Sequence, residues 1–211
     1  MAKVIYSKET ILANAFEMAT DVGFESITAR TLAKRIGCST APIYTAYKNI
    51  DELKNNIRTK VFKKINEYTL VPYTDDAFLN IGVGILAFAR DYKNLYREVF
   101  INSSSAEFGN NYVEKFVNRM KTGYISKHFT HAETRIILSK MWIFTHGIAT
   151  IICSDRLRKL DTEYFVNLLS ELGLEIMTST ALKSGKIEEF MKEFYSGHVA
   201  EEFVSPDWEV W

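Results

Sequence analysis

The sequence predicts an all-α protein. Turn-forming residues are scarce, with three prolines and ten glycines in 211 residues, and apolar residues recur at helical spacing along most of the chain. The hydrophobic fraction of 47% is ordinary for a water-soluble protein, and the length suffices for one sizeable core or two small ones.

The two cysteines, Cys38 and Cys153, stand far apart and in no metal-ligand spacing. No secretory leader precedes them, so a reducing cytoplasm is the expected location and neither a disulfide nor a zinc site is expected. Both are expected to be small core residues.

The formal net charge of zero hides an asymmetry between the two ends of the chain. The first 67 residues carry 11 Lys and Arg against 7 Asp and Glu, and the remainder carries 15 against 19. The basic excess therefore lies in the N-terminal third, as expected of a nucleic-acid-binding module joined to another domain.

A first helix is expected from the N-cap Ser7 to Gly23, and Phe24 and Ile27 should pack back against it. Its role is to hold the two following helices at a fixed angle. Its apolar stripe is Ile11, Leu12, Ala15, Phe16, Ala19 and Val22.

Residues 28–47 predict two short helices around a tight turn. Thr28 is a good N-cap for the first, and Gly37 is expected to end it by supplying a left-handed or unhindered backbone. Ser39 is expected to cap the second, with Pro42 at its third position and Ile43 as its apolar anchor.

The other faces of the second helix carry short polar or apolar groups and two phenols, with no acidic side chain. Such a surface suits the major groove, where hydroxyls bond to base edges or phosphates and methyls meet thymine. The pattern predicts a helix-turn-helix with the second helix as reader. The alternative is an ordinary corner between helices in an all-helical protein.

This region resembles the TetR family of transcriptional regulators over about residues 7–65. The shared pattern is an apolar helix ending in Gly, a Thr-capped helix, a Gly turn, a Ser-capped helix and a Tyr followed by an aromatic residue. The residues that carry it are Ile11, Ala15, Phe16, Ala19, Gly23, Phe24, Thr28, Arg30, Leu32, Ala33, Gly37, Ser39, Ile43, Tyr44, Tyr47 and Leu53.

Two positions depart from the family pattern. Ala46 stands where a His or aromatic residue is usual, and Ile50 stands where a phosphate-contacting Lys is usual. That role is therefore expected of Lys48 or Lys54.

The expected DNA contacts divide into two kinds. Thr28, Tyr44, Tyr47 and Lys48 are expected to position the DNA backbone. Thr40, Ala41, Pro42, Thr45 and Arg30 are expected to read bases, and Ser39 and Lys54 complete the surface.

A connecting helix is expected from its cap Asn49 to Tyr68, with Glu52 in a variant capping box. Pro72 marks a break. The expected domains are residues 1–49 for the helix-turn-helix, 50–71 for the connecting helix and 72–211 for a larger C-terminal ligand-binding and dimerisation domain. The connecting helix should bury Leu53, Ile57, Val61 and Ile65.

Helices are expected over 75–92, 94–100 and 107–128, with Gly82 and Gly84 permitting close approach of a neighbour. The aromatic residues are expected to line a pocket for a largely apolar or aromatic effector or, equally, to fill the core. The candidate ligand-binding residues are Phe88, Tyr92, Tyr96, Phe108, Tyr112, Phe116, Tyr124, Trp142 and His146.

The segment 133–153 is the most apolar, but Arg135, Lys140 and His146 interrupt it, which argues against a membrane span. A helix apolar on all sides should be buried on all sides, partly against a second subunit, with 162–182 beside it. The resemblance likewise implies a homodimer. The expected interface is Ile148, Ile152, Phe165, Leu168, Leu169, Leu172 and Ile176.

No nucleophile–base pair or nucleotide-binding motif occurs, and His128 and His131 have a cap, Thr130, between them. No catalytic residue, metal or cofactor is therefore expected. The leading hypothesis is a homodimeric repressor released from a palindromic operator by a small effector. Two alternatives stay open: a TetR-like protein that acts through another regulator with weak operator binding, and an enzyme on a helical scaffold.

Overall fold

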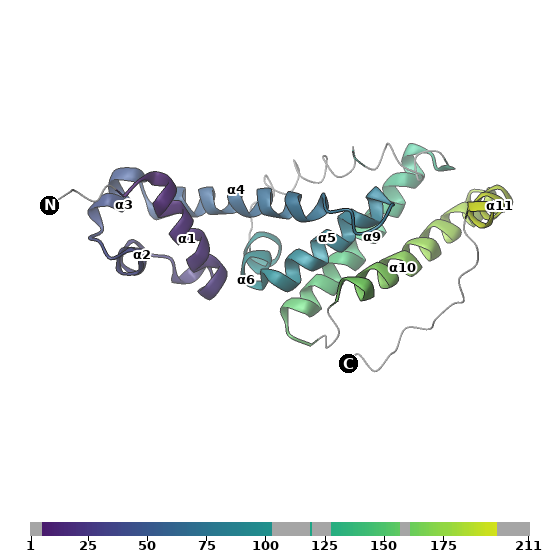
Figure 1. Ribbon diagram of the computed structural model, residues 1–211. Helices are drawn as coiled ribbons and strands as arrows, with labels where there is room; N and C mark the ends of the chain where they lie inside the picture. Colours follow the sequence, from purple (N-terminus) through teal and green to yellow (C-terminus); the bar gives the residue numbers. More distant parts are fainter. Residues whose placement is uncertain (1–5, 103–118, 120–127, 157–160, 198–211) are drawn as a thin grey trace. The chain divides into compact units, whose positions relative to one another are not determined.

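The computed structural model describes residues 6–102, 119, 128–156 and 161–197, and the regular elements in these ranges are all helices (Figure 1). The chain divides into two compact units: residues 1–67 with 91–104, and residues 68–90 with 105–211. The all-α prediction is confirmed. Segment 91–104 groups with the N-terminal unit, whereas the expected boundaries placed it in the C-terminal domain.

The first unit begins with α1 (Lys8–Val22), capped by Ser7, whose hydroxyl accepts a hydrogen bond from Thr10 N at 3.1 Å. Gly23, with φ 83°, ends the helix. The 3-10 helix η1 (Phe24–Ser26) follows, with the Phe24 ring buried. Val22 was expected in the apolar stripe, but it is 56% exposed, and Met18 is buried instead.

The motif helices are α2 (Ala29–Ile36) and α3 (Ala41–Ala46). Thr28 caps α2 in a capping box with Thr31. Gly37 ends the helix, as expected, with a left-handed backbone of φ 78°. The prediction that Ser39 caps α3 is wrong: the Thr40 carbonyl accepts the first hydrogen bond of the helix, from Ile43 N at 3.1 Å, which makes Thr40 the N-cap.

The long helix α4 (Ile50–Thr69) starts as expected, because Asn49 Oδ1 accepts from Glu52 N at 2.8 Å. Its four predicted core residues, Leu53, Ile57, Val61 and Ile65, are all buried. The first unit also contains α6 (Lys93–Tyr96), which continues as the π-helix η2 (Arg97–Asn102). Helix α6 packs against α1.

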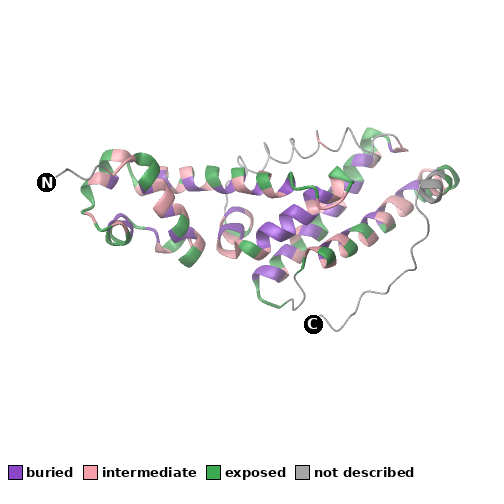
Figure 2. Cartoon of the chain, viewed as in Figure 1, coloured by how far each residue is buried: buried purple, intermediate pink, exposed green. Residues whose placement is uncertain are grey.

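The second unit contains α5 (Ala77–Asp91), whose residues from Asn80 to Ala89 are buried except for the half-buried Gly82 (Figure 2). A β-carbon on Gly84 would lie 2.5 Å from the Tyr68 carbonyl oxygen, and one on Gly82 would lie 2.8 Å from Leu169 Cδ1. The expectation that these glycines permit close packing is confirmed.

Helices α9 (His131–Cys153) and α10 (Thr162–Lys183) run side by side in the second unit, and α11 (Ile187–Gly197) packs on α10 (Figure 1). Thr130 and Glu133 form a capping box at the start of α9. The helix expected over 107–128 lies outside the described residues, apart from Arg119 and His128.

By length and composition, α9 is the one helix in the described ranges that is apolar enough to cross a membrane, and a third of its most apolar stretch is buried within the chain. The remainder presents large apolar side chains to solvent, with Ile143 69% exposed and Ile136 50% exposed. This face of α9 therefore calls for an apolar neighbour other than the helices described in its own chain.

Candidate nucleic-acid interface

Helix α3 has one buried residue and an otherwise open surface. Ile43 is fully buried and anchors the helix, whereas Ala41, Thr45 and Tyr44 are exposed, Tyr44 by 57%. Residues 28–47 contain no Asp or Glu, so nothing on this surface repels a phosphate. A short helix with small side chains and one outward phenol is shaped to enter a major groove.

The predicted base readers are on this surface or beside it. Arg30 and Thr40 are exposed, and Pro42 is half-buried in the first turn of α3. The Thr45 hydroxyl donates to the Ala41 carbonyl at 2.9 Å. Because that proton is used within the helix, Thr45 offers a base its methyl group and the remaining acceptor capacity of its oxygen.

Thr28 and Ser39 are also exposed, at the start of α2 and just before α3. The Thr28 hydroxyl lies 3.1 Å from Thr31 N, from which it accepts a hydrogen bond. The Thr31 hydroxyl in turn donates to the Ser26 carbonyl at 2.7 Å. Thr28 is therefore held in place by its capping role before any ligand arrives.

Tyr47 does not belong to this surface, contrary to prediction. It is 1% exposed, its hydroxyl donates to the Lys8 carbonyl at 3.3 Å, and the Lys8 ammonium lies 4.5 Å from its ring centroid. Helix α3 ends at Ala46, and the extended backbone of Tyr47, φ −135° and ψ 134°, breaks the helical spacing from Tyr44. Burial raises the pKa of Tyr47. The residue fixes α1 to the end of α3.

Lys48, one of the two candidate phosphate-binding lysines, contributes its backbone N–H to a cluster at the start of α4. The Glu52 carboxylate accepts hydrogen bonds from Lys48 N at 2.8 Å and from Lys8 Nζ at 3.2 Å. Both bonds lower the pKa of Glu52, and the bond from Lys48 N–H has the larger effect. Lys48 is exposed and Lys54 is half-buried. Ala46 and Ile50, the two departures from the family pattern, are also half-buried.

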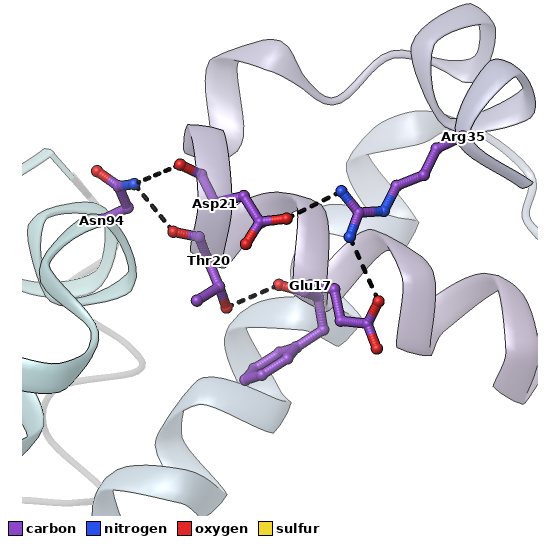
Figure 3. Close-up of polar contacts among 6 residues, drawn as sticks. Glu17, Thr20, Asp21, Arg35 and Asn94 are labelled. Carbon is purple, nitrogen blue, oxygen red and sulfur yellow. Dashed lines mark hydrogen bonds and ion pairs between the residues drawn. The ribbon is translucent and has the colours of Figure 1, made fainter.

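An ion-pair cluster that the sequence analysis missed joins α2 to α1. Arg35 lies 2.9 Å from Asp21 Oδ2 and 3.3 Å from Glu17 Oε2, and the hydrogen bond to Asp21 is the main cause of the raised Arg35 pKa (Figure 3). The sequence signal was available, because Glu17 and Asp21 stand four apart on one face of α1. Arg35 is thus directed towards α1, whereas Arg30 is exposed and forms no ion pair with a carboxylate in the described part of the chain.

The candidate ligand-binding residues do not form one described site. Phe108, Tyr112, Phe116 and Tyr124 lie outside the described residues, whereas Tyr92 and Tyr96 belong to the first unit. Tyr96 is buried there with its ring centroid 4.8 Å from that of Phe100.

Phe88, Trp142 and His146 belong to the second unit. Phe88 is fully buried and meets Tyr68 edge to face, with ring centroids 5.7 Å apart. The Trp142 and His146 rings lie 4.0 Å apart on α9, and burial lowers the pKa of His146 to about 4, which leaves the imidazole neutral at pH 7.

The predicted dimer residues separate into two sets. Ile152, Phe165, Leu169 and Ile176 are buried within their own chain, so their assignment to the interface is wrong: they pack in the core that contains α9 and α10. Ile148, Leu168 and Leu172 are half-buried. The large exposed apolar side chains on α9 are Ile136, Ile143 and Phe144, which the prediction omitted.

No group of three or more His, Cys, Asp or Glu is placed to hold a metal ion in the part of the chain that the structure describes. A small pocket lies near the end of α10 and the start of α11, and none of the predicted ligand-binding residues lines it. Its lining residues are His128, Phe129, Ala181, Lys186, Glu189 and Phe190.

No protein-family model matches the sequence. No curated protein matches it either. Among solved structures, the crystal structure of a TetR-like transcriptional regulator from Rhodococcus sp. RHA1 is similar, with a TM-score of 0.58 at 14% sequence identity. The match covers 84% of this chain and 98% of the regulator. The chain therefore has the fold of a TetR-like transcriptional regulator.

Proposed function

We propose that this chain, which has the fold of a TetR-like transcriptional regulator, is a cytoplasmic, non-enzymatic DNA-binding regulator. The observation that carries the proposal is the exposed, acid-free surface of α3 with Tyr44 at its centre. Phosphate contacts come from Tyr44, Lys48, Lys54 and the start of α2, and base contacts come from Arg30, Thr40, Pro42 and Thr45.

The regulator acts as a homodimer on a palindromic operator. The support is the face of α9 made by Ile136, Ile143 and Phe144, which leaves large apolar side chains in water in the single chain. A second copy related by a two-fold axis covers that face with the same face, and it presents two reading helices to two half-sites. The half-buried Ile148, Leu168 and Leu172 belong to the same interface.

The mode of action is repression relieved by a small apolar or aromatic effector that binds in the second unit. The buried Phe88, the Trp142–His146 ring pair and the neutral state of His146 support an apolar site with one polar contact. The effector must favour a spacing of the reading helices that no longer matches the two half-sites, and a hundredfold preference corresponds to about 2.7 kcal/mol.

Ala46 and Ile50 favour a second candidate function, because both depart from the family pattern and Ile50 stands where a phosphate-contacting Lys is usual. In this alternative the protein keeps the fold but acts through another regulator, with weak operator binding of its own. The two functions differ in one measurable quantity, the affinity of the purified protein for specific DNA.

The test is selection of genomic fragments bound by the purified protein, followed by fluorescence anisotropy on the selected sites. A repressor enriches a palindromic site and binds it with a slope of log affinity against log salt of about −5 or steeper, as expected for six or more phosphate contacts. Enrichment of no site, or binding without salt dependence, contradicts the proposal and favours the alternative.

A further inference from the structure

The C-terminal end of α1 is held by a side chain from a distant part of the sequence. The last carbonyls of a helix have no donor within it, and the last turn of α1 carries no basic residue. The side-chain amide of Asn94, in α6, donates to the Thr20 carbonyl at 2.9 Å and to the Asp21 carbonyl at 3.3 Å (Figure 3). Asn94 therefore supplies the donor that α1 lacks.

The same segment also holds α4. Glu98, four residues after Asn94, accepts from Arg58 Nε at 3.0 Å and forms an ion pair with the Arg58 guanidinium. The Arg58 guanidinium also lies 5.4 Å from the ring centroid of Phe24, which follows α1. Asn94 and Glu98 thus attach one short segment to two helices of the DNA-binding unit.

Asn94 is linked to α2 of the helix-turn-helix through Asp21 of α1. The backbone carbonyl of Asp21 accepts from Asn94, and its carboxylate accepts from Arg35 of α2 at 2.9 Å (Figure 3). Fraying of the last turn of α1 would move the Asp21 carboxylate, which is one of the two carboxylates that pair with Arg35 of α2. The Asn94 hydrogen bonds therefore support one of the contacts that position α2.

The chain connects Asn94 to the second unit at both ends of its segment. Residues 91–104 belong to the first unit, whereas residues 68–90 and 105–211 belong to the second. The chain thus crosses between the units before residue 91 and after residue 104, in addition to the crossing within α4. A change in the second unit has a covalent route to α1 that does not pass through α4.

We propose that Asn94 is a positioning residue for DNA recognition, whose side-chain amide holds the C-terminus of α1 and so couples segment 91–104 to the helix-turn-helix. The proposal rests on the function proposed above, because it concerns regulation of the same DNA-binding surface. It adds a second connection, through α1, to the one that α4 provides where the chain passes from the first unit to the second.

Three variants separate the donor from the shape of the side chain. Asn94→Ala removes the amide. Asn94→Asp keeps nearly the same shape but offers the two carbonyls no N–H donor at neutral pH. The matched control is Asn14→Ala, because the Asn14 amide donates to the Thr10 carbonyl at 2.9 Å within α1 itself.

The first readout is amide hydrogen exchange of the full-length protein without DNA. Exchange in residues 18–26 is expected to become about five to ten times faster in Asn94→Ala and in Asn94→Asp, as loss of a hydrogen bond at a helix end predicts. The Asn14→Ala variant is expected to match wild type in this region. Equal exchange in all four proteins overturns the proposal.

The second readout tests the coupling itself. If Asn94 links the DNA-bound state to its segment, linkage requires operator DNA to slow exchange in residues 93–102 of the wild-type protein. This slowing is expected to disappear in Asn94→Ala, whose operator affinity should fall about five- to tenfold. Slowing that persists in Asn94→Ala shows that the residue is only structural and overturns the coupling.

The two proposals fail in different ways. If wild type selects no operator, the proposed regulatory function fails, and with it the role of Asn94 in DNA recognition. The exchange rates without DNA then still decide whether Asn94 holds α1. If wild type binds an operator and Asn94→Ala binds it with wild-type affinity and exchange, the inference fails and the proposed function stands.

Discussion

Gly84 lies directly against the backbone of Tyr68: a β-carbon on Gly84 would lie 2.5 Å from the Tyr68 carbonyl oxygen and 2.7 Å from Thr69 Cα. The end of α4 and the middle of α5 can approach this closely only because position 84 has no side chain.

Gly84→Ala is expected to lower the free energy of unfolding by about 1–3 kcal/mol, because backbone atoms cannot move aside for a methyl group. Gly82→Ala is the matched control on the same helix. Its β-carbon would meet the end of the flexible Leu169 side chain, so its effect is expected to stay within about 1 kcal/mol. Chemical denaturation of both variants measures this difference, and equal stability contradicts the prediction.

Glu98→Gln is expected to destabilise the protein by about 1–2 kcal/mol, because it removes the charge that pairs with the Arg58 guanidinium in a largely buried site. Side-chain exposures are 23% for Arg58 and 12% for Glu98. Glu67→Gln is the control, since the Lys64–Glu67 pair is more exposed and its loss should change stability by about 0.5 kcal/mol or less. A similar effect of both variants in urea denaturation would refute the distinction.

Stability is expected to decline below pH 5 partly through Glu133. Hydrogen bonds from Ser184, Lys186 and Thr130 lower its pKa to about 2, from an ordinary value of 4.5. A lowered folded-state pKa stabilises the fold fully above pH 4.5, and this contribution is lost as the pH falls towards 2. Glu133→Gln should therefore show a shallower decline between pH 5 and pH 2, measured by thermal unfolding, than wild type or an exposed control, Glu163→Gln.

Tyr44→Phe and Tyr47→Phe are expected to affect different properties. Tyr44 is exposed, so loss of its hydroxyl should weaken binding to all operators alike, by about five- to tenfold, without changing stability. The Tyr47 hydroxyl donates to the Lys8 carbonyl, so its loss should lower the free energy of unfolding by about 1 kcal/mol. Anisotropy and denaturation of both variants test the pair, and Thr45→Ala should instead change the preference among operators.

Ile143→Lys is expected to convert the proposed homodimer to a monomer, because it places a charge on the exposed apolar face of α9. Val22→Lys is the control, since Val22 is also exposed, by 56%, but lies on α1 of the other unit. Analytical ultracentrifugation at micromolar concentration should give a dimer for wild type and the control. A wild-type monomer, or a dimeric Ile143→Lys variant, contradicts the proposed interface.

The sequence by itself determined the features that depend only on residues close by along the chain. The caps Ser7, Thr28, Asn49 and Thr130 were predicted correctly, as was the end of α2 at Gly37, because each acts within one turn of its own position. The buried ladder of α4 followed from a four-residue repeat. The need for small residues in α5 was also readable, although the contacting partner was not.

Only the tertiary structure decided which face of a helix meets which neighbour. Tyr44 and Tyr47 stand three residues apart, yet one is exposed and the other buried, because α3 ends between them. In α9 and α10 the apolar residues run all round, so periodicity could not separate the buried Ile152 and Phe165 from the exposed Ile143. Helical spacing specifies a stripe only when the opposite face is polar.

The grouping of residues 91–104 with the first unit could not be predicted from the sequence either. It depends on Asn94 and Glu98 meeting α1 and α4, at separations of 73 and 74 residues for the two Asn94 bonds and 40 residues for the Glu98 bond. An Asn and a Glu in a short polar helix look like solvent-facing residues until the distant carbonyls and guanidinium are placed beside them. Contacts of this kind form when the chain packs, and no local pattern records them.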